Sequence, residues 1–234
     1  MQGLVTAAFG MALLLLQAAG AWAAEPVKQI GIFVQPYYES ARAPDAAPRV
    51  AVGRSFDRLL ASNSRDDILA ARDMIAGESG LVTPMTMMVL AIRCYDLGLR
   101  DEAVFWFYAA KIRYQVLADV IDVEAAGLSQ VRDAVASFAY LAGPVINGYA
   151  FCDPGKQAEI HRKALDWVER NPYAAMLMTK LPARPGERAA NAARSLAKAR
   201  ASAAKESAYF ADRGNVEEFF ATRATTGAEG KYCW

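Results

Sequence analysis

The chain has 234 residues, 54% of them hydrophobic, and its 26 basic and 25 acidic residues leave a formal net charge of +1. A charge balance of this kind does not predict binding to nucleic acid or to another polyanion through the chain as a whole. The length is sufficient for one large domain with a substantial hydrophobic core.

The amino-terminal segment has the composition of an export signal. Residues 1–23 contain no charged side chain, the run Met11–Leu16 is strongly apolar, and Ala21 and Ala23 have the spacing that signal peptidases cleave. We therefore expect the mature chain to begin at Ala24, in the periplasm or outside the cell. The alternative is an uncleaved membrane anchor, although the apolar core is shorter than the roughly 20 residues that span a bilayer.

Residues 24–50 are expected to form an irregular arm. Within it, residues 27–34 could be a short strand or simply extended, and the proline-containing segment 43–48 predicts a loop. Tyr37 and Tyr38 are candidate contacts for a partner, because exposed tyrosine is favoured at interfaces. The alternative is that both tyrosines pack the arm against the rest of the protein.

From residue 51 to 234, the pattern predicts one helical domain. Ser64 and Thr83 are typical helix starts, and Gly77 and Gly98 are typical helix ends. The expected helices cover about 65–77, 85–97, 101–120, 129–141 with a possible continuation to 152 across Gly143-Pro144, 154–170 and 187–211, with shorter ones near 173–178 and 219–220. We predict an all-α fold without a substantial sheet, either a multi-helix bundle or a short superhelix of helical hairpins.

The three cysteines are expected to have two different roles. Cys94 lies in an apolar helical stretch and is predicted to be a small buried residue. Cys152 lies beside a turn, and Cys233 is close to the carboxyl end. If the chain is exported, these two cysteines meet an oxidising compartment, and we expect a disulfide between them that closes a long loop.

One predicted hairpin carries a pattern of small and aromatic residues. The pattern consists of Leu90, Ala91, Gly98, Asp101, Glu102, Ala103, Trp106, Phe107 and Ala110. With this spacing, residues 84–117 resemble a single hairpin of the tetratricopeptide repeat family or of its Sel1-like variant. The resemblance implies that small residues let the two helices pack closely and that the glycine ends the first of them.

The same resemblance implies which residues of the first helix would face a ligand groove. They are Met85, Met88, Ile92, Tyr95 and Asp96. Either these side chains line an apolar, adaptable groove for a partner, or neighbouring helices cover them. We favour the second alternative, because methionine and aromatic residues at helical spacing usually form core.

Catalytic machinery is sparse in this sequence. His161 is the only histidine and is expected on a helix surface, so neither a histidine-dependent triad nor a multi-histidine metal site is predicted. No metal or other cofactor is expected. Glu78 is the one candidate acid: its Glu-Ser-Gly context resembles that of exported lysozyme-like transglycosylases, in which a buried carboxylic acid acts on the cell wall. The alternative is a helix end followed by a turn.

Residues 156–206 contain eleven lysines and arginines but five acidic residues. The basic helix within them, which includes Arg188, Arg194, Lys198 and Arg200, either contacts anionic lipid or glycan or is simply solvated, and the second is commoner. Our prediction is an exported protein with a non-catalytic protein-binding role, such as an envelope adaptor or an immunity-type binder, with a partner of unknown identity. A transglycosylase using Glu78 is the alternative.

Overall fold

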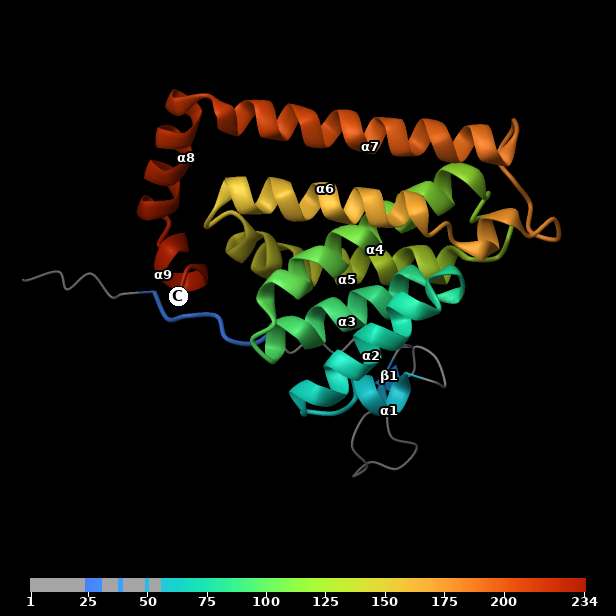
Figure 1. The fold of residues 1–234 in the computed structure, drawn as a ribbon, viewed down its shortest axis with the longest axis horizontal. Helices are drawn as coiled ribbons and strands as arrows, with labels where there is room; N and C mark the ends of the chain where they lie inside the picture. The colour runs from blue at the N-terminus through green and yellow to red at the C-terminus, as the bar shows by residue number, and fades with distance from the viewer. Residues whose placement is uncertain (1–23, 31–37, 40–48, 51–55) are drawn as a thin grey trace, which may run out of the picture.

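The computed structural model describes residues 24–30, 38–39, 49–50 and 56–234. The described part confirms the predicted all-α fold (Figure 1). Its helices are α1 Asp57–Leu60, α2 Arg65–Gly77, α3 Pro84–Asp96, α4 Arg100–Val120, α5 Ser129–Ala150, α6 Pro154–Arg170, α7 Arg188–Ala211, α8 Arg213–Thr225 and α9 Ala228–Tyr232, with 3-10 turns η1 Ser79–Leu81 and η2 Ala174–Leu177. Two short strands, β1 Tyr38–Glu39 and β2 Arg49–Val50, pair antiparallel with Tyr38 opposite Val50. Residues 1–23, the predicted signal segment, lie outside the described residues.

Several helices begin where a side chain can satisfy an otherwise unpaired backbone N–H. The acceptor and donor atoms are Ser64 Oγ and Asp67 N at 3.4 Å, Thr83 Oγ1 and Thr86 N at 3.1 Å, and Asp153 Oδ1 and Lys156 N at 3.0 Å. The turn between α3 and α4 contains Gly98 at a φ of +78°, a conformation that favours glycine. These local signals confirm the predicted starts of α2, α3 and α6 and the predicted end of α3.

Helix α5 continues through Pro144, where the sequence left open a break. A proline cannot donate to the carbonyl four residues earlier, here that of Tyr140. Tyr140 is 80% exposed, so water can reach this turn of the helix and hydrate the carbonyl. Helix α5 packs against α3 and α4, and buried residues before the proline (Phe138, Ala142) and after it (Ile146) hold the helix on both sides. The interpretation that the helix continues past the proline is therefore right as far as Ala150, and the helix ends before Cys152.

The core is centred on α3, whose residues from Pro84 to Ile92 are all buried. Helix α3 packs against α4, and α4 also contacts α5, α6 and α7. Figure 1 shows α7 running along one side of the molecule beyond α6, while α8 turns across one end and leads to α9. Within the described ranges, no helix is both long and apolar enough to cross a membrane.

Arg113 of α4 is 1% exposed and holds two turns against the core. Its guanidinium donates to the carbonyl oxygens of Ser79 at 2.6 Å, Val82 at 2.9 Å and Asn171 at 2.6 Å. It also lies 4.7 Å from the centre of the Trp167 ring. Burial lowers the pKa of Arg113 to about 10. The segments before α3 and after α6 are therefore tied together by one side chain.

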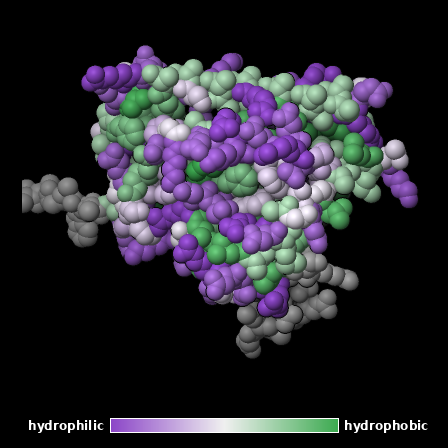
Figure 2. Space-filling view, viewed as in Figure 1, coloured by the Kyte–Doolittle hydropathy of each residue, from purple (hydrophilic) through white to green (hydrophobic). Residues whose placement is uncertain are grey.

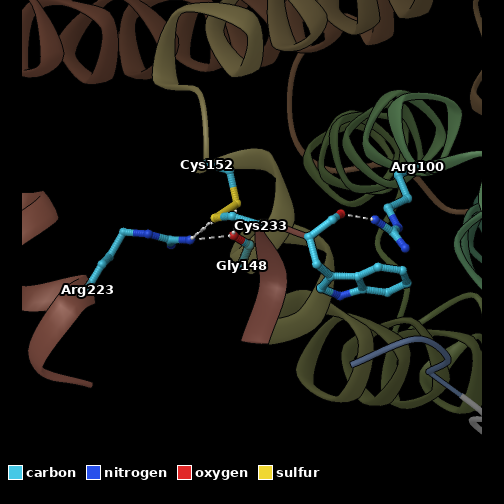
Figure 3. The surroundings of a disulfide bond; sticks show 6 residues. Arg100, Gly148, Cys152, Arg223 and Cys233 are labelled. Atoms are coloured by element: carbon cyan, nitrogen blue, oxygen red, sulfur yellow. Dashed lines mark hydrogen bonds between the residues drawn. A yellow bond between two sulfur atoms is a disulfide. The ribbon is translucent and has the colours of Figure 1, made fainter. Parts of the chain in front are cut away.

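The predicted disulfide joins Cys152 and Cys233, with Cα atoms 5.6 Å apart, and is confirmed (Figure 3). Arg223 of α8 donates to the carbonyl of Gly148 at 2.9 Å and lies beside both sulfur atoms. A Cβ on Gly148 would lie 2.6 Å from the ring of Tyr232, which explains a glycine inside α5. The bond therefore fixes α9 against the end of α5.

The remaining cysteine, Cys94, is buried in α3 and unpaired, as predicted. Burial raises the pKa of its thiol to about 12. A thiol of this kind is protonated at neutral pH and is a poor nucleophile. Cys94 is therefore a packing residue.

The segment Ala24–Ile30 runs along α9 and the end of α3. The Val27 backbone donates to the carbonyl of Lys231 at 2.9 Å and accepts from the Tyr95 hydroxyl at 2.9 Å. The Ile30 N–H donates to the Asp96 carboxylate at 2.6 Å. Residues 24–30 form no strand or helix, and the strands β1 and β2 lie farther along the segment 24–50 for which an irregular arm was expected.

Candidate functional site

The structure places four of the five residues predicted from the hairpin resemblance in the core, whereas Asp96 is part-buried and accepts from the Ile30 N–H. Met85, Met88, Ile92 and Tyr95 are at most 2% exposed, because α1, α2, α4 and α5 surround α3. The interpretation in which these four side chains line a binding groove is therefore wrong for this structure, and the favoured interpretation as core residues is right.

The tyrosines of the arm remain a prediction. Tyr37 lies outside the described residues, and of Tyr38 only the backbone in β1 is described. Their role as partner contacts is therefore not decided by the fold.

Glu78 is exposed and forms the C-cap of α2. Its backbone N–H donates to the carbonyl of Met74 at 2.9 Å, and η1 follows directly. A general acid for glycoside cleavage needs a carboxyl group shielded from water beside its substrate. Glu78 therefore ends a helix and begins a turn, which is the alternative interpretation of its Glu-Ser-Gly context. Its assignment as a candidate general acid is corrected accordingly.

The basic helix α7 uses three of its four named cations within the protein, and one of them, Arg194, donates to the Asn191 side chain of the same helix. Arg188 donates to the carbonyls of Met176 and Leu181, and Arg200 forms ion pairs with Asp166 and Glu169. These contacts attach α7 to η2 and to α6. They favour the interpretation of this helix as a structural and solvated element over one that binds anionic lipid.

A polar pocket of about 240 Å³ lies between α4, α5, α6 and α7. Its lining residues are Tyr108, Lys111, Ile112, Gln115, Asn147, Phe151, Gln157, His161, Ala199, Ser202 and Glu206. The residues from each helix are mostly three or four positions apart, which places them on one face of that helix. Figure 2 shows hydrophilic side chains along much of the line where α6 and α7 run side by side.

A hydrogen-bond network connects the four helices inside the pocket. The Tyr108 hydroxyl donates to Asn147 Oδ1 at 3.1 Å and accepts from Gln157 Nε2 at 3.0 Å. Gln157 Nε2 also donates to Glu206 Oε1 at 2.8 Å. Gln157 is 1% exposed, and its Oε1 has no hydrogen-bond donor among the described residues. Burial raises the pKa of Tyr108 to about 12, so its hydroxyl stays protonated.

His161 completes the pocket from α6 and is part-buried, where the sequence predicted a surface residue. Its ring centre lies 4.7 Å from that of Tyr108, and its Nδ1 lies 3.5 Å from Glu206 Oε1. This distance is too long for a good hydrogen bond. His161 lowers the pKa of the Glu206 carboxyl, burial opposes this effect, and Gln157 lowers the pKa further. Glu206 is therefore an ionised acceptor at neutral pH.

Lys111 brings the opposite charge to the pocket. The side chain keeps an exposed flank, but burial of the ammonium group lowers its pKa, while the neighbouring Glu206 acts in the other direction. In the described ranges, no carboxylate lies within ion-pair distance of the Lys111 ammonium, which sits 5.4 Å from the centre of the Phe107 ring. The pocket therefore combines an anion, an unpaired cation and neutral donors and acceptors.

Replacement of Glu206 by glutamine is expected to lower the free energy of unfolding at neutral pH but not in acid. The folded state holds the pKa of Glu206 below the value near 4.3 of an unfolded chain, so ionised Glu206 contributes stability above about pH 5. That contribution disappears as the pH falls through the folded pKa. Urea unfolding of both proteins at about pH 7 and about pH 3 measures the difference. Glu218→Gln on α8 is the control. A difference in the free energy of unfolding between wild type and Glu206→Gln that is the same at both pH values would contradict the lowered pKa of Glu206.

The comparisons with known proteins give one relative. A protein of Haemophilus influenzae, described as an uncharacterized protein, is 30% identical over 234 residues, which is 100% of this chain and 88% of the relative. No family model matches the chain. No solved structure matches it.

Proposed function

The chain belongs to the same family as that Haemophilus influenzae protein, and we propose that it is an exported helical protein with a non-catalytic binding role. The proposed location is the periplasm or the outside of the cell. The Cys152–Cys233 disulfide supports this location, because such bonds persist in oxidising compartments and are rare in the cytosol. The signal-like composition of residues 1–23 supports it independently.

The polar pocket beneath α7 is the observation that carries the binding role. Polar side chains inside a protein are normally hydrogen-bonded, and a buried acceptor without a donor costs about 1–3 kcal/mol. Gln157 Oε1 is such an acceptor, and it lines the same pocket as Lys111, a cation that has no ion pair in the described part of the chain. Clefts with a few convergent polar groups are typical binding sites. An incoming polar group would satisfy both Gln157 and Lys111.

The proposed partner is another protein, and an envelope adaptor or an immunity-type binder is the class that suits an exported helical chain. At about 240 Å³, the pocket is slightly below the roughly 300–1,000 Å³ of typical ligand sites. It suits a single residue projecting from a partner, or a comparably small molecule. Tyr37 and Tyr38 remain predicted additional contacts, and substitution of both by alanine is expected to weaken the complex.

The central hairpin is proposed to be of the tetratricopeptide type. Helices α3 and α4 pack closely, Gly98 lies in the turn between them, and the small residues Ala91, Ala103 and Ala110 are all buried. In this chain, the hairpin would serve as the core on which α5, α6 and α7 assemble the pocket, rather than as the binding surface itself.

Filling the pocket from its exposed side tests the binding role. Ser202→Trp places a large side chain in the pocket without replacing a buried residue. Ser207→Trp, on the same helix but outside the pocket lining, is the matched control. The full chain, exported with its own amino-terminal segment, is used to capture partners from an envelope extract. Wild type and Ser207→Trp are expected to retain one stoichiometric partner that Ser202→Trp loses, and equal capture by all three would contradict the role of the pocket.

A further inference from the structure

Three groups in the pocket have hydrogen-bonding or electrostatic capacity that the described protein does not use: Lys111, Gln157, and His161, whose Nδ1 lies 3.5 Å from Glu206 Oε1 without a hydrogen-bond partner. The Lys111 ammonium has no carboxylate within ion-pair distance among the described residues, and Gln157 Oε1 has no donor there. The Gln157 amide cannot turn without loss, because its Nε2 already donates to Tyr108 and to Glu206. A ligand that satisfies Lys111 and Gln157 together carries an anionic acceptor for Lys111 and an N–H or O–H donor for Gln157 Oε1.

We propose that the pocket binds a carboxylate with an N–H group on the neighbouring carbon, the chemistry of an α-amino acid. The carboxylate pairs with Lys111, and the N–H donates to Gln157 Oε1. This inference rests on the proposed function and names the group that the pocket takes. The same chemistry occurs in two sources, a free amino acid and the carboxyl-terminal residue of a partner protein.

The charges in the pocket favour a single carboxylate over a more highly charged anion. Glu206 is ionised and lies in the same pocket as Lys111, so the site as a whole is close to neutral. A phosphate or a dicarboxylate would bring at least one negative charge toward Glu206 that Lys111 alone does not balance. A free amino acid adds an ammonium group that Glu206 attracts, whereas a chain terminus adds a neutral amide N–H.

The apolar part of the lining suits a small side chain. Ile112, Phe151 and Ala199 contribute apolar surface beside the polar groups. A ligand with one small aliphatic side chain can therefore be desolvated on one side while its carboxylate and N–H face Lys111 and Gln157. Alanine and its derivatives have this size and are suitable probes.

The test uses the full chain and three probes, titrated by isothermal calorimetry or by NMR. L-Alanine represents the free amino acid, N-acetyl-L-alanine represents a chain terminus, and L-alaninamide lacks the carboxylate. At least one of the first two is expected to bind about tenfold or more tightly than L-alaninamide, because a hydrogen bond to a charged group has that effect. Stronger binding of L-alanine identifies a free amino acid, and stronger binding of N-acetyl-L-alanine identifies a chain terminus.

Substitution of the cation locates the carboxylate. Lys111→Met is expected to reduce the affinity about tenfold or more, while Lys205→Met, an exposed position of α7 outside the pocket, leaves it unchanged. Equal binding of L-alaninamide, no effect of Lys111→Met, or no binding of any probe at millimolar concentration overturns the inference. If the probes fail while Ser202→Trp still abolishes capture of a partner, the pocket is a binding site for a different group, and only the present inference is lost.

Discussion

Replacing Cys152 and Cys233 together by serine is expected to lower the free energy of unfolding by about 4 kcal/mol. The two residues are 81 positions apart, so their bond restricts a long loop in the unfolded chain. Without the bond, α9 is held to α5 by contacts such as that of Tyr232 with Gly148. The loss therefore combines a more disordered unfolded state with a weakened contact in the folded state.

Equilibrium urea unfolding of the wild type and the double serine variant, with and without a reductant, measures this effect. The reductant is expected to bring the wild type to the stability of the variant and to leave the variant unchanged. Because Cys94 is buried and unpaired, it does not provide an alternative bond. A double variant within about 1 kcal/mol of the oxidised wild type would show that the bond contributes little to stability.

Arg113→Met is expected to lower the free energy of unfolding by about 3 kcal/mol. Methionine keeps much of the apolar stem but removes the donors to the carbonyls of Ser79, Val82 and Asn171. Each buried carbonyl left without a donor costs about 1–3 kcal/mol, and the relief from burying a charge offsets part of the total. The turns before α3 and after α6 should also exchange their amide hydrogens faster, because Arg113 no longer ties them together.

Arg170→Met is the matched control for this substitution. Arg170 is exposed at the end of α6 and donates to the carbonyl of Asp166 within its own helix. Its replacement is expected to change stability by less than about 0.5 kcal/mol, as is usual for surface positions. Equal urea midpoints for the Arg113 and Arg170 variants would contradict the role of Arg113 as the link between the two turns.

Local features of this fold were predictable because they depend on neighbouring residues. The caps at Ser64, Thr83 and Asp153 satisfy backbone groups within three residues, and such patterns are visible in a sequence. The disulfide was predictable for a different reason, since Cys94 lies in an apolar stretch and leaves two cysteines to pair. The continuation of α5 through Pro144 was left open because it depends on packing against α3 and α4.

The candidate site was not predictable in the same way. Tyr108, Asn147, Gln157 and Glu206 come from four helices, and none of their spacings along the chain indicates that they meet. Gln157 and His161 are four residues apart and therefore lie on one face of α6. In the sequence, however, polar residues at this spacing predict only an ordinary solvent-exposed face. Conversely, the Glu-Ser-Gly context of Glu78 suggested an acid, whereas the fold uses this residue to end α2.

The most direct test of an exported binding protein is native mass spectrometry of the chain recovered from the cell envelope. The chain is expected to begin at Ala24, to contain the Cys152–Cys233 bond and to carry a bound partner or small ligand. The added mass should be absent from Ser202→Trp and present in Ser207→Trp. A chain that retains residues 1–23, has reduced cysteines and carries no added mass in any of the three proteins would contradict both the export and the binding role.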